Sequence, residues 1–376
     1  MSNSDFLEEL RGRELRGGGW SFFGSRQVSL EATSLAILCL LAERPSEALR
    51  LGKLLSDVQL ADGSWPSFVG DRESSWTTAL AVCAFNSVND PSKARERGES
   101  WLLRTKGREG HWFWRWKFKT ADRNVQFDPD KYGWPWISGS ASWVIPTAFS
   151  IIAIKQFTVC NRSEESEKRI HLGVEMLLDR ACVDGGWNSG NSVVYGVPLR
   201  PHVEATAIAL LALQDEQRTE MVQRSLSWLR QYAASVDSVS SLAWCILTLF
   251  VYQEPIGGLK NRLATIIGDG RDIRNNATLA TAILALKCGE MIHPFEVLRT
   301  SSSARIRSAK RFSYAGNVNS VAGLAGRNRI LAQKPNRLLT AASVRTREIG
   351  ASPALARSWA KLCRSARVMR ASGFFA

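Results

Sequence analysis

The sequence contains no apolar run long enough to cross a membrane and no paired cysteine motif. Apolar stretches such as residues 35–42 fall far short of the roughly 20 residues that a membrane-spanning helix needs. Residues 1–15 are polar and acidic and lack the apolar segment of a secretory signal peptide, so we expect a cytoplasmic protein. The seven cysteines are scattered and form no Cys-x-x-Cys pair, which favours reduced thiols in a core.

Acidic residues are almost missing from the end of the chain. Residues 301–376 hold 15 lysines and arginines but only one acid, Glu348. Subtracting these from the totals of 49 basic and 35 acidic residues leaves 34 of each in residues 1–300. The net charge of +14 therefore belongs to the tail, and the neutral main body gives no reason to expect a nucleic-acid partner.

The tail differs from the rest of the chain in pattern as well as in charge. Residues 300–376 are rich in Arg, Ser and Ala, so we expect partial disorder there. Residues 353–370 fit a basic amphipathic helix that touches a membrane or RNA. The abrupt change also fits a terminus translated out of frame. We divide the chain into an N-terminal segment (1–16), a main domain (17–299) and the tail (300–376).

Alternating strand patterns are also lacking, and a two-part helical unit recurs instead. Its first part is a turn with the pattern Gly-x-Trp, present at Trp20, Trp65, Trp112 and Trp187, with a variant in KYGWPW (131–136). Its second part is an almost wholly apolar helix that follows about 10–20 residues later. These helices are expected at residues 30–41, 75–85, 143–154 and 203–213, with weaker copies at 240–250 and 277–287.

The helices that precede the turns have a different character. Residues 97–104 and 222–231 carry one apolar and one charged stripe, as an outer layer would, whereas apolar helices are buried on both faces. Alternation of the two kinds predicts an all-α fold, an α/α toroid. This is a barrel of helical hairpins with inner and outer helix rings. A curved solenoid is the alternative.

Several of these units resemble the "QW" repeat of squalene–hopene and oxidosqualene cyclases. The resemblance rests on Gln59-Leu-Ala-Asp-Gly63-Ser-Trp65, on residues 97–112 and on residues 177–187, and it covers roughly residues 17–290. It implies an α/α barrel shared with the prenyltransferase β-subunits, in which Gln and Trp brace helix ends against the next hairpin. The cyclases have two such barrels, and this chain matches one.

The resemblance to the cyclases supports their fold more fully than their reaction. Class II terpene cyclases protonate their substrate with an Asp-x-Asp-Asp motif, and this motif is absent, as is the Asp-rich motif of class I synthases. Prenyltransferases hold zinc with Asp, Cys and His, but Cys245 has no acid two residues before it. We therefore expect no metal and no cofactor, and isomerase-class activity of the terpene cyclase kind stays open.

Four residues are candidate catalytic groups. Asp128 and Asp130 stand two apart, and a buried pair could share a proton; an exposed turn is the alternative. Glu204 and His202 stand at the start of an apolar helix, as Glu31 does in the first unit. A buried His–Glu pair could act as acid and base, while helix capping is the simpler interpretation.

Tryptophans are the candidate substrate-binding residues. Thirteen of the fourteen precede residue 245, and aromatic faces both line apolar pockets and stabilise cations. We assign Trp20, Trp65, Trp112 and Trp187 to structural bracing. The candidates for binding substrate are Trp76, Trp134, Trp136 and Trp143.

The sequence thus predicts a cyclase-like toroid that binds or transforms an isoprenoid-like apolar molecule. The alternative is a non-catalytic toroid scaffold that binds a protein or peptide partner. Peripheral membrane contact and the oligomeric state are left open.

Overall fold

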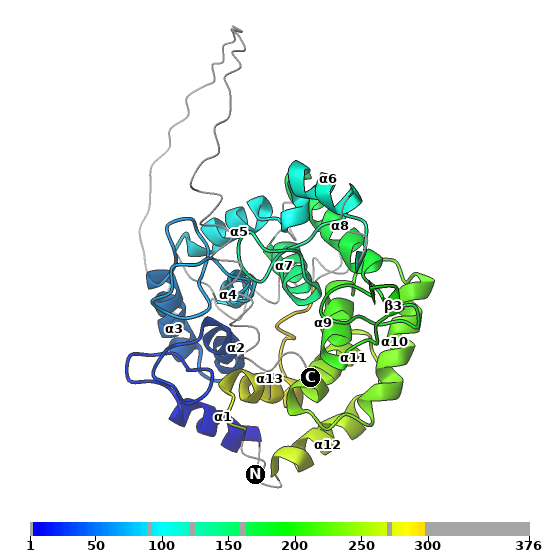
Figure 1. Cartoon of the computed structure of the whole chain (residues 1–376). Helices are drawn as coiled ribbons and strands as arrows, with labels where there is room; N and C mark the ends of the chain where they lie inside the picture. The colour runs from blue at the N-terminus through cyan, green and yellow to red at the C-terminus, as the bar shows by residue number, and fades with distance from the viewer. Residues whose placement is uncertain (1–2, 89–91, 121–124, 158–162, 269–272, 298–376) are drawn as a thin grey trace, which may run out of the picture. The chain divides into compact units, whose positions relative to one another are not determined.

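A ring of helices makes up the described part of the chain, which in this computed structural model comprises residues 3–88, 92–120, 125–157, 163–268 and 273–297 (Figure 1). The predicted tail, 300–376, and its helix at 353–370 lie outside the described residues. Six inner helices are α2 (Leu30–Leu40), α4 (Thr77–Ser87), α7 (Val144–Phe157), α9 (Val203–Ala212), α11 (Val239–Val251) and α13 (Asn276–Leu286). Six outer helices are α1 (Asn3–Gly12), α3 (Pro45–Asp57), α5 (Ala94–Arg104), α8 (Glu164–Asp179), α10 (Glu220–Ala233) and α12 (Gly257–Gly268).

The inner ring is closed. Each inner helix contacts the next, and α13, the last, contacts both α11 and α2. The structure confirms the all-α toroid, and its closure excludes the curved solenoid for the described residues. Burial follows the predicted pattern: every residue of α9 from Ala205 to Ala212 is buried, whereas α10 buries one stripe.

Four tryptophans hold the hairpins together in the same way. Each is buried, and its indole N–H donates to the carbonyl of a leucine near the end of an outer helix. Each backbone N–H donates to a threonine hydroxyl in the following inner helix. The four indole bonds join Trp20 to Leu10 (2.6 Å), Trp65 to Leu55 (2.7 Å), Trp134 to Leu102 (2.8 Å) and Trp187 to Leu177 (2.6 Å). The threonines are Thr33, Thr78, Thr147 and Thr206.

Gln59 and two glycines add to this bracing. The Gln59 amide donates to the carbonyls of Gly63 and Ala94, each at 2.8 Å, which ties the end of α3 to the start of α5. Gly98 lies directly against the ring of Trp65, and Gly173 against the ring of Trp134. A Cβ at either position would come within 2.7 Å of the indole, so the close approach requires glycine.

The third brace differs from the sequence prediction. Trp112 is not a brace: it lies in the additional helix α6 (Trp112–Thr120) and its side chain is 79% exposed. Trp134 takes its place, because the chain between α5 and this turn is longer than in the other hairpins. That insertion also contains the 3₁₀ turn η1 (Arg108–Gly110) and strand β1 (Val125–Gln126). Strand β1 pairs with β2 (Val193–Val194), which pairs with β3 (Val197–Pro198), all antiparallel.

The turns also bring the amino ends of the inner helices to one end of the ring. The first residues of α2 and α7 and the N-cap Trp76 of α4 donate backbone N–H groups to the turn of the following hairpin. The start of α13 donates back to the first turn. These bonds run from Leu30 to Ser67, from Trp76 to Trp136, from Val144 to Ser189 and from Asn276 to Phe22. We call this end the mouth.

The opposite end is crossed by residues 293–297, which follow α13. The Gln156 amide donates to the carbonyls of Pro294 (2.8 Å) and Glu296 (3.1 Å), and Gln214 donates to the carbonyl of Phe295. His293 bonds to the Leu247 carbonyl at 3.0 Å. These partners lie at or near the carboxyl ends of α7, α9 and α11, so the segment closes this end and directs Phe295 inward. We call residues 293–297 the plug.

Replacement of tryptophan by phenylalanine should affect stability at a brace position but not at Trp112. Trp65→Phe leaves the buried Leu55 carbonyl without its donor and creates a small void, so we expect the free energy of unfolding to fall by about 2–4 kcal/mol. Trp112→Phe, at an exposed site, should leave it unchanged. Urea denaturation followed by circular dichroism measures both. Equal losses would contradict the brace.

Candidate functional site

Partly exposed side chains gather at the mouth, at the first turns of inner helices that are otherwise buried. Four of them occupy the same register, two residues before the threonine that receives the brace: Glu31, Trp76, Ile145 and Glu204. Deeper positions in these helices are buried. The brace therefore determines which residue of each helix faces the mouth, and it places two carboxylates and one indole there.

Glu31 and Glu204 interact across the ring. They belong to α2 and α9, which stand three places apart in the ring of six. Burial raises the pKa of Glu31 to about 7, with a smaller contribution from repulsion by Glu204. Burial also raises the pKa of Glu204, opposed by the hydrogen bond that the Ser240 hydroxyl donates at 3.2 Å. Burial at this position therefore favours the protonated form of Glu31.

His202 lies next to this pair but does not join it. It is the N-cap of α9, its backbone N–H donates to the Trp187 carbonyl, and its side chain is exposed. The buried His–Glu pair considered from the sequence is absent, because the His202 side chain is exposed and the Glu204 carboxylate accepts its hydrogen bond from Ser240. An acid–base role for His202 stays a prediction.

A continuous series of aromatic contacts leads from the mouth into the ring. Trp136 meets Trp76 edge to face with ring centroids 5.0 Å apart, and Trp76 contacts Phe149 at 5.8 Å. Phe149 contacts Trp244 and the plug residue Phe295 at 5.4 and 5.8 Å. Trp76 and Trp136 are partly exposed, whereas Phe149, Trp244 and Phe295 are buried. The interior is therefore aromatic, and its deeper part is filled by these rings.

The other tryptophans predicted to bind substrate lie in two different settings. Trp134 is a brace with 1% exposure, and its ring is covered by the Arg169 guanidinium, 3.3 Å from the centroid. Trp143 immediately precedes α7, is partly exposed, and its ring lies beside Gly190 of the following turn. Trp143 thus remains available at the mouth, as Trp76 and Trp136 do.

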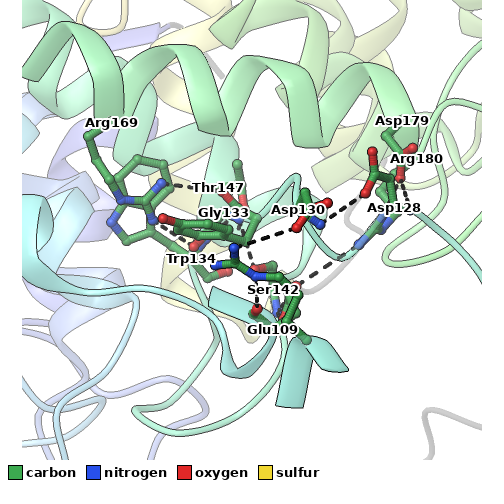
Figure 2. A network of polar contacts seen from close by, with 12 residues as sticks. Glu109, Asp128, Asp130, Gly133, Trp134, Ser142, Thr147, Arg169, Asp179 and Arg180 are labelled. Carbon is green, nitrogen blue, oxygen red and sulfur yellow. Dashed lines mark hydrogen bonds and ion pairs between the residues drawn. The ribbon is translucent and has the colours of Figure 1, made fainter. Parts of the chain in front are cut away.

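Asp128 and Asp130 lie beside the end of outer helix α8 and not among the first turns of the inner helices (Figure 2). Asp130 forms ion pairs with Arg115 (3.5 Å) and Lys119, and Asp128 pairs with Lys131 (3.6 Å). The Asp130 N–H donates to the Asp128 carboxylate at 2.9 Å, as in an Asx turn. Both side chains are substantially exposed. The structure does not bring these carboxylates to Glu204, and their catalytic role stays a prediction.

The same view shows how buried charges support the third brace (Figure 2). Arg169 donates to the carbonyls of Gly133 (2.6 Å) and Thr105 (2.9 Å), while Glu109 accepts from the Ser142 N–H at 3.1 Å. Arg180 lies 4.0 Å from Glu109. Each buried charge has polar partners, so this cluster fixes the long insertion rather than presenting reactive groups.

The sequence indicated that Glu31 and Glu204 stand at equivalent helix starts, but Glu31 was not among the predicted catalytic residues. The motif Glu-Ala-Thr occurs twice, at residues 31–33 and 204–206, and both threonines receive a brace. This shared motif is the signal that could have added Glu31 to them. Phe295 had no comparable signal. Among the described residues, no group of three His, Cys, Asp or Glu side chains is arranged to hold a metal ion.

Comparisons with known proteins support the fold. No protein-family model matches the sequence, and no curated protein matches it. Among solved structures, an alpha-amylase from Clostridium perfringens matches with a TM-score of 0.54 at 10% identity, over 77% of this chain and 98% of the other. This likeness shows the toroid alone.

Two further neighbours belong to other enzyme classes. A type II terpene cyclase from Scytonema in complex with geranylgeranyl dihydroxybenzoate has a TM-score of 0.48 at 15% identity, over 76% of this chain and 94% of that one. Candida albicans protein geranylgeranyltransferase-I, complexed with GGPP, has a TM-score of 0.46 at 9% identity, over 75% and 91%. Structural neighbours thus include terpene cyclase, prenyltransferase and glycoside hydrolase folds.

The raised pKa of Glu31 has a consequence for stability. Between the ordinary glutamate pKa of 4.5 and about 7, the folded state binds more protons than the unfolded state, so Glu31 lowers the free energy of unfolding as pH rises. Glu31→Gln removes this term. We expect the stability of the variant relative to the wild type to increase as pH rises from about 4.5 to about 7.

Urea denaturation at several pH values measures the difference between the two proteins. Glu175→Gln, on the exposed side of α8, is the control and should show no such gain. A difference for Glu31→Gln that is constant across this range would contradict a carboxyl group that titrates near neutral pH.

Proposed function

We propose that the mouth of the ring binds an isoprenoid-like apolar molecule and that the Glu31–Glu204 pair supplies a proton to it. The observation that carries the proposal is the placement of two carboxyl groups with raised pKa at the same end of the ring as partly exposed indole rings. A general acid acts best when its pKa lies near the working pH, and Glu31 has such a pKa. The resemblance to cyclases points to the same substrate class.

The proposed reaction is an isomerisation, in which one proton is added to the substrate and one is removed. The protonated carboxyl group of Glu31 donates its proton to one carbon of a substrate double bond, and the electron pair of that double bond forms the new C–H bond. The cation left on the other carbon attacks within the molecule or shifts. A proton then returns to the carboxylate, so the composition of the substrate is unchanged. Burial, with a smaller contribution from repulsion by Glu204, keeps the proton on Glu31.

The tryptophans at the mouth fit the cationic stage of this reaction. Indole faces attract cations, by up to about 2 kcal/mol for a desolvated contact. Trp76 stands in the same register as the two carboxylates, and Trp136 packs against its edge. Trp143 is the third partly exposed indole at this end. These rings would also hold an apolar chain by burying its surface.

A second function, the non-catalytic scaffold, is favoured by one observation. Phe149, Trp244 and Phe295 pack together inside the ring, with exposures of 1%, 5% and 0%. While the plug holds Phe295 there, the deeper interior offers no room for a long chain. A scaffold would use the outer surface and leave the mouth without a ligand.

Ligand binding and turnover test the proposal. The purified chain is incubated with squalene and with prenyl diphosphates, tryptophan fluorescence is followed, and products and co-purified lipid are identified by mass analysis. We expect a fluorescence change and an isomer of unchanged mass. Glu31→Gln should abolish turnover while leaving binding within about twofold, because it removes the proton and not the apolar contacts.

Trp76→Ala should weaken binding by about tenfold, whereas the exposed Trp112→Ala should not change it. Absence of binding and of bound lipid would contradict the proposal and favour the scaffold. Cleavage of a glucan oligosaccharide that requires Glu31 would contradict it in favour of glycoside hydrolysis.

Removal of the Phe295 ring tests whether the interior takes part. Phe295→Ala, in the complete chain, empties space next to Trp244 and should tighten binding of long prenyl chains relative to short ones. Phe85→Ala creates a similar void beside Trp65, away from the aromatic series, and serves as the control. A preference for chain length that is the same in both variants would show that ligands stop at the mouth.

A further inference from the structure

Helix α6 presents an unusual surface of exposed aromatic rings. Trp112, Phe113 and Trp116 are 79%, 48% and 60% exposed, and no residue of this nine-residue helix is buried. At 3.6 residues per turn the three rings fall on one face of the helix. Exposed aromatic rings carry a cost in water, so three on one face indicate a surface that is covered in use.

The opposite face attaches α6 to the ring. Trp114 and Phe118 lie against each other, and Phe118 contacts Phe127 with centroids 5.3 Å apart. The Arg115 guanidinium donates to the Gly110 carbonyl at 3.2 Å and pairs with Asp130 at 3.5 Å. The helix is therefore attached through one face only. Its aromatic residues on the other face take no part in this packing.

Basic side chains border the aromatic face on both sides. By helical geometry Lys117 follows the face on one flank and Lys119 on the other. Residues 105–120 contain five basic residues and a single acid, Glu109, which is buried. Lys117 lies 4.9 Å from the Trp114 ring, and Lys119 pairs with the exposed Asp130. The accessible charge around the rings is thus mainly positive.

We propose that α6 binds the surface of an anionic lipid membrane. Aromatic rings on one face and lysines at its borders are the pattern of a helix that lies in the interface, with rings at the acyl boundary and ammonium groups at the phosphates. Among the described residues no helix has the length and apolarity to span a bilayer, so α6 would hold the protein on the membrane from one side.

Single-stranded nucleic acid is the competing occupant, and the geometry favours lipid. A strand needs a groove that follows its backbone and rings that bases can stack upon in succession. Here Trp112 and Phe113 meet edge to face at 82° on a convex helix, which offers no such series of parallel platforms. A single short helix binds weakly, and the basic residues of the tail would add electrostatic attraction.

Vesicle co-sedimentation of the full-length chain tests this assignment. The probes are phosphatidylcholine vesicles with about 30% phosphatidylserine and vesicles of phosphatidylcholine alone. We expect binding to the anionic vesicles, with a blue shift of tryptophan emission and quenching by brominated acyl chains. The double substitution Trp112→Ala/Trp116→Ala should lower partitioning by at least about tenfold and remove most of the quenching. Lys117→Gln should weaken binding only to the anionic vesicles.

The control is Phe23→Ala, which removes an aromatic ring that is 62% exposed elsewhere on the molecule. It should bind vesicles as the wild type does. Vesicle binding that survives the double substitution, as binding through the tail alone would, overturns the proposal. Failure to bind anionic vesicles, together with binding of a single-stranded oligonucleotide that the double substitution abolishes, overturns it in favour of nucleic acid.

Discussion

The fold depends on one repeated hydrogen-bonded unit, the buried tryptophan that links an outer helix to the inner helix after it. Its indole satisfies a leucine carbonyl near the end of the outer helix, and its backbone binds a threonine in the inner helix. The unit occurs at Trp20, Trp65, Trp134 and Trp187. A buried carbonyl without a partner costs about 1–3 kcal/mol, so each brace fixes where a helix ends as well as what it packs against.

The same unit determines the composition of the mouth. Because each threonine is fixed, the residue two positions before it faces the mouth, and this register supplies Glu31, Trp76, Ile145 and Glu204. Two of these are carboxyl groups on opposite sides of the ring, and burial raises the pKa of both, that of Glu31 to about 7. A structural repeat has thus been given different side chains at one equivalent position, which is how a site can be placed on a fold without changing its framework.

Much of the fold could be predicted because its signals are local. The Gly-x-Trp turns and the alternation of apolar with amphipathic helices are readable within short windows, and they indicated the toroid. The assignment of Trp112 as a brace was wrong, although its turn matches the repeat. The third brace is Trp134, which follows an insertion, and no local sequence pattern indicates the length of that insertion. The spacing of Asp128 and Asp130 could not show on which side of the ring they lie. Phe295 contacts helices from distant parts of the chain, and such contacts leave no mark near residue 295.

The proposed function depends on binding of the isoprenoid-like molecule at the mouth and not at the outer helices. Photo-crosslinking with a diazirine-bearing prenyl analogue, followed by peptide mapping, tests it most directly. The account predicts labels on Trp76, Trp136, Trp143 and Ile145, and competition by unlabelled prenyl compounds. Labels confined to the outer helices or to α6, with none at the mouth, would contradict it.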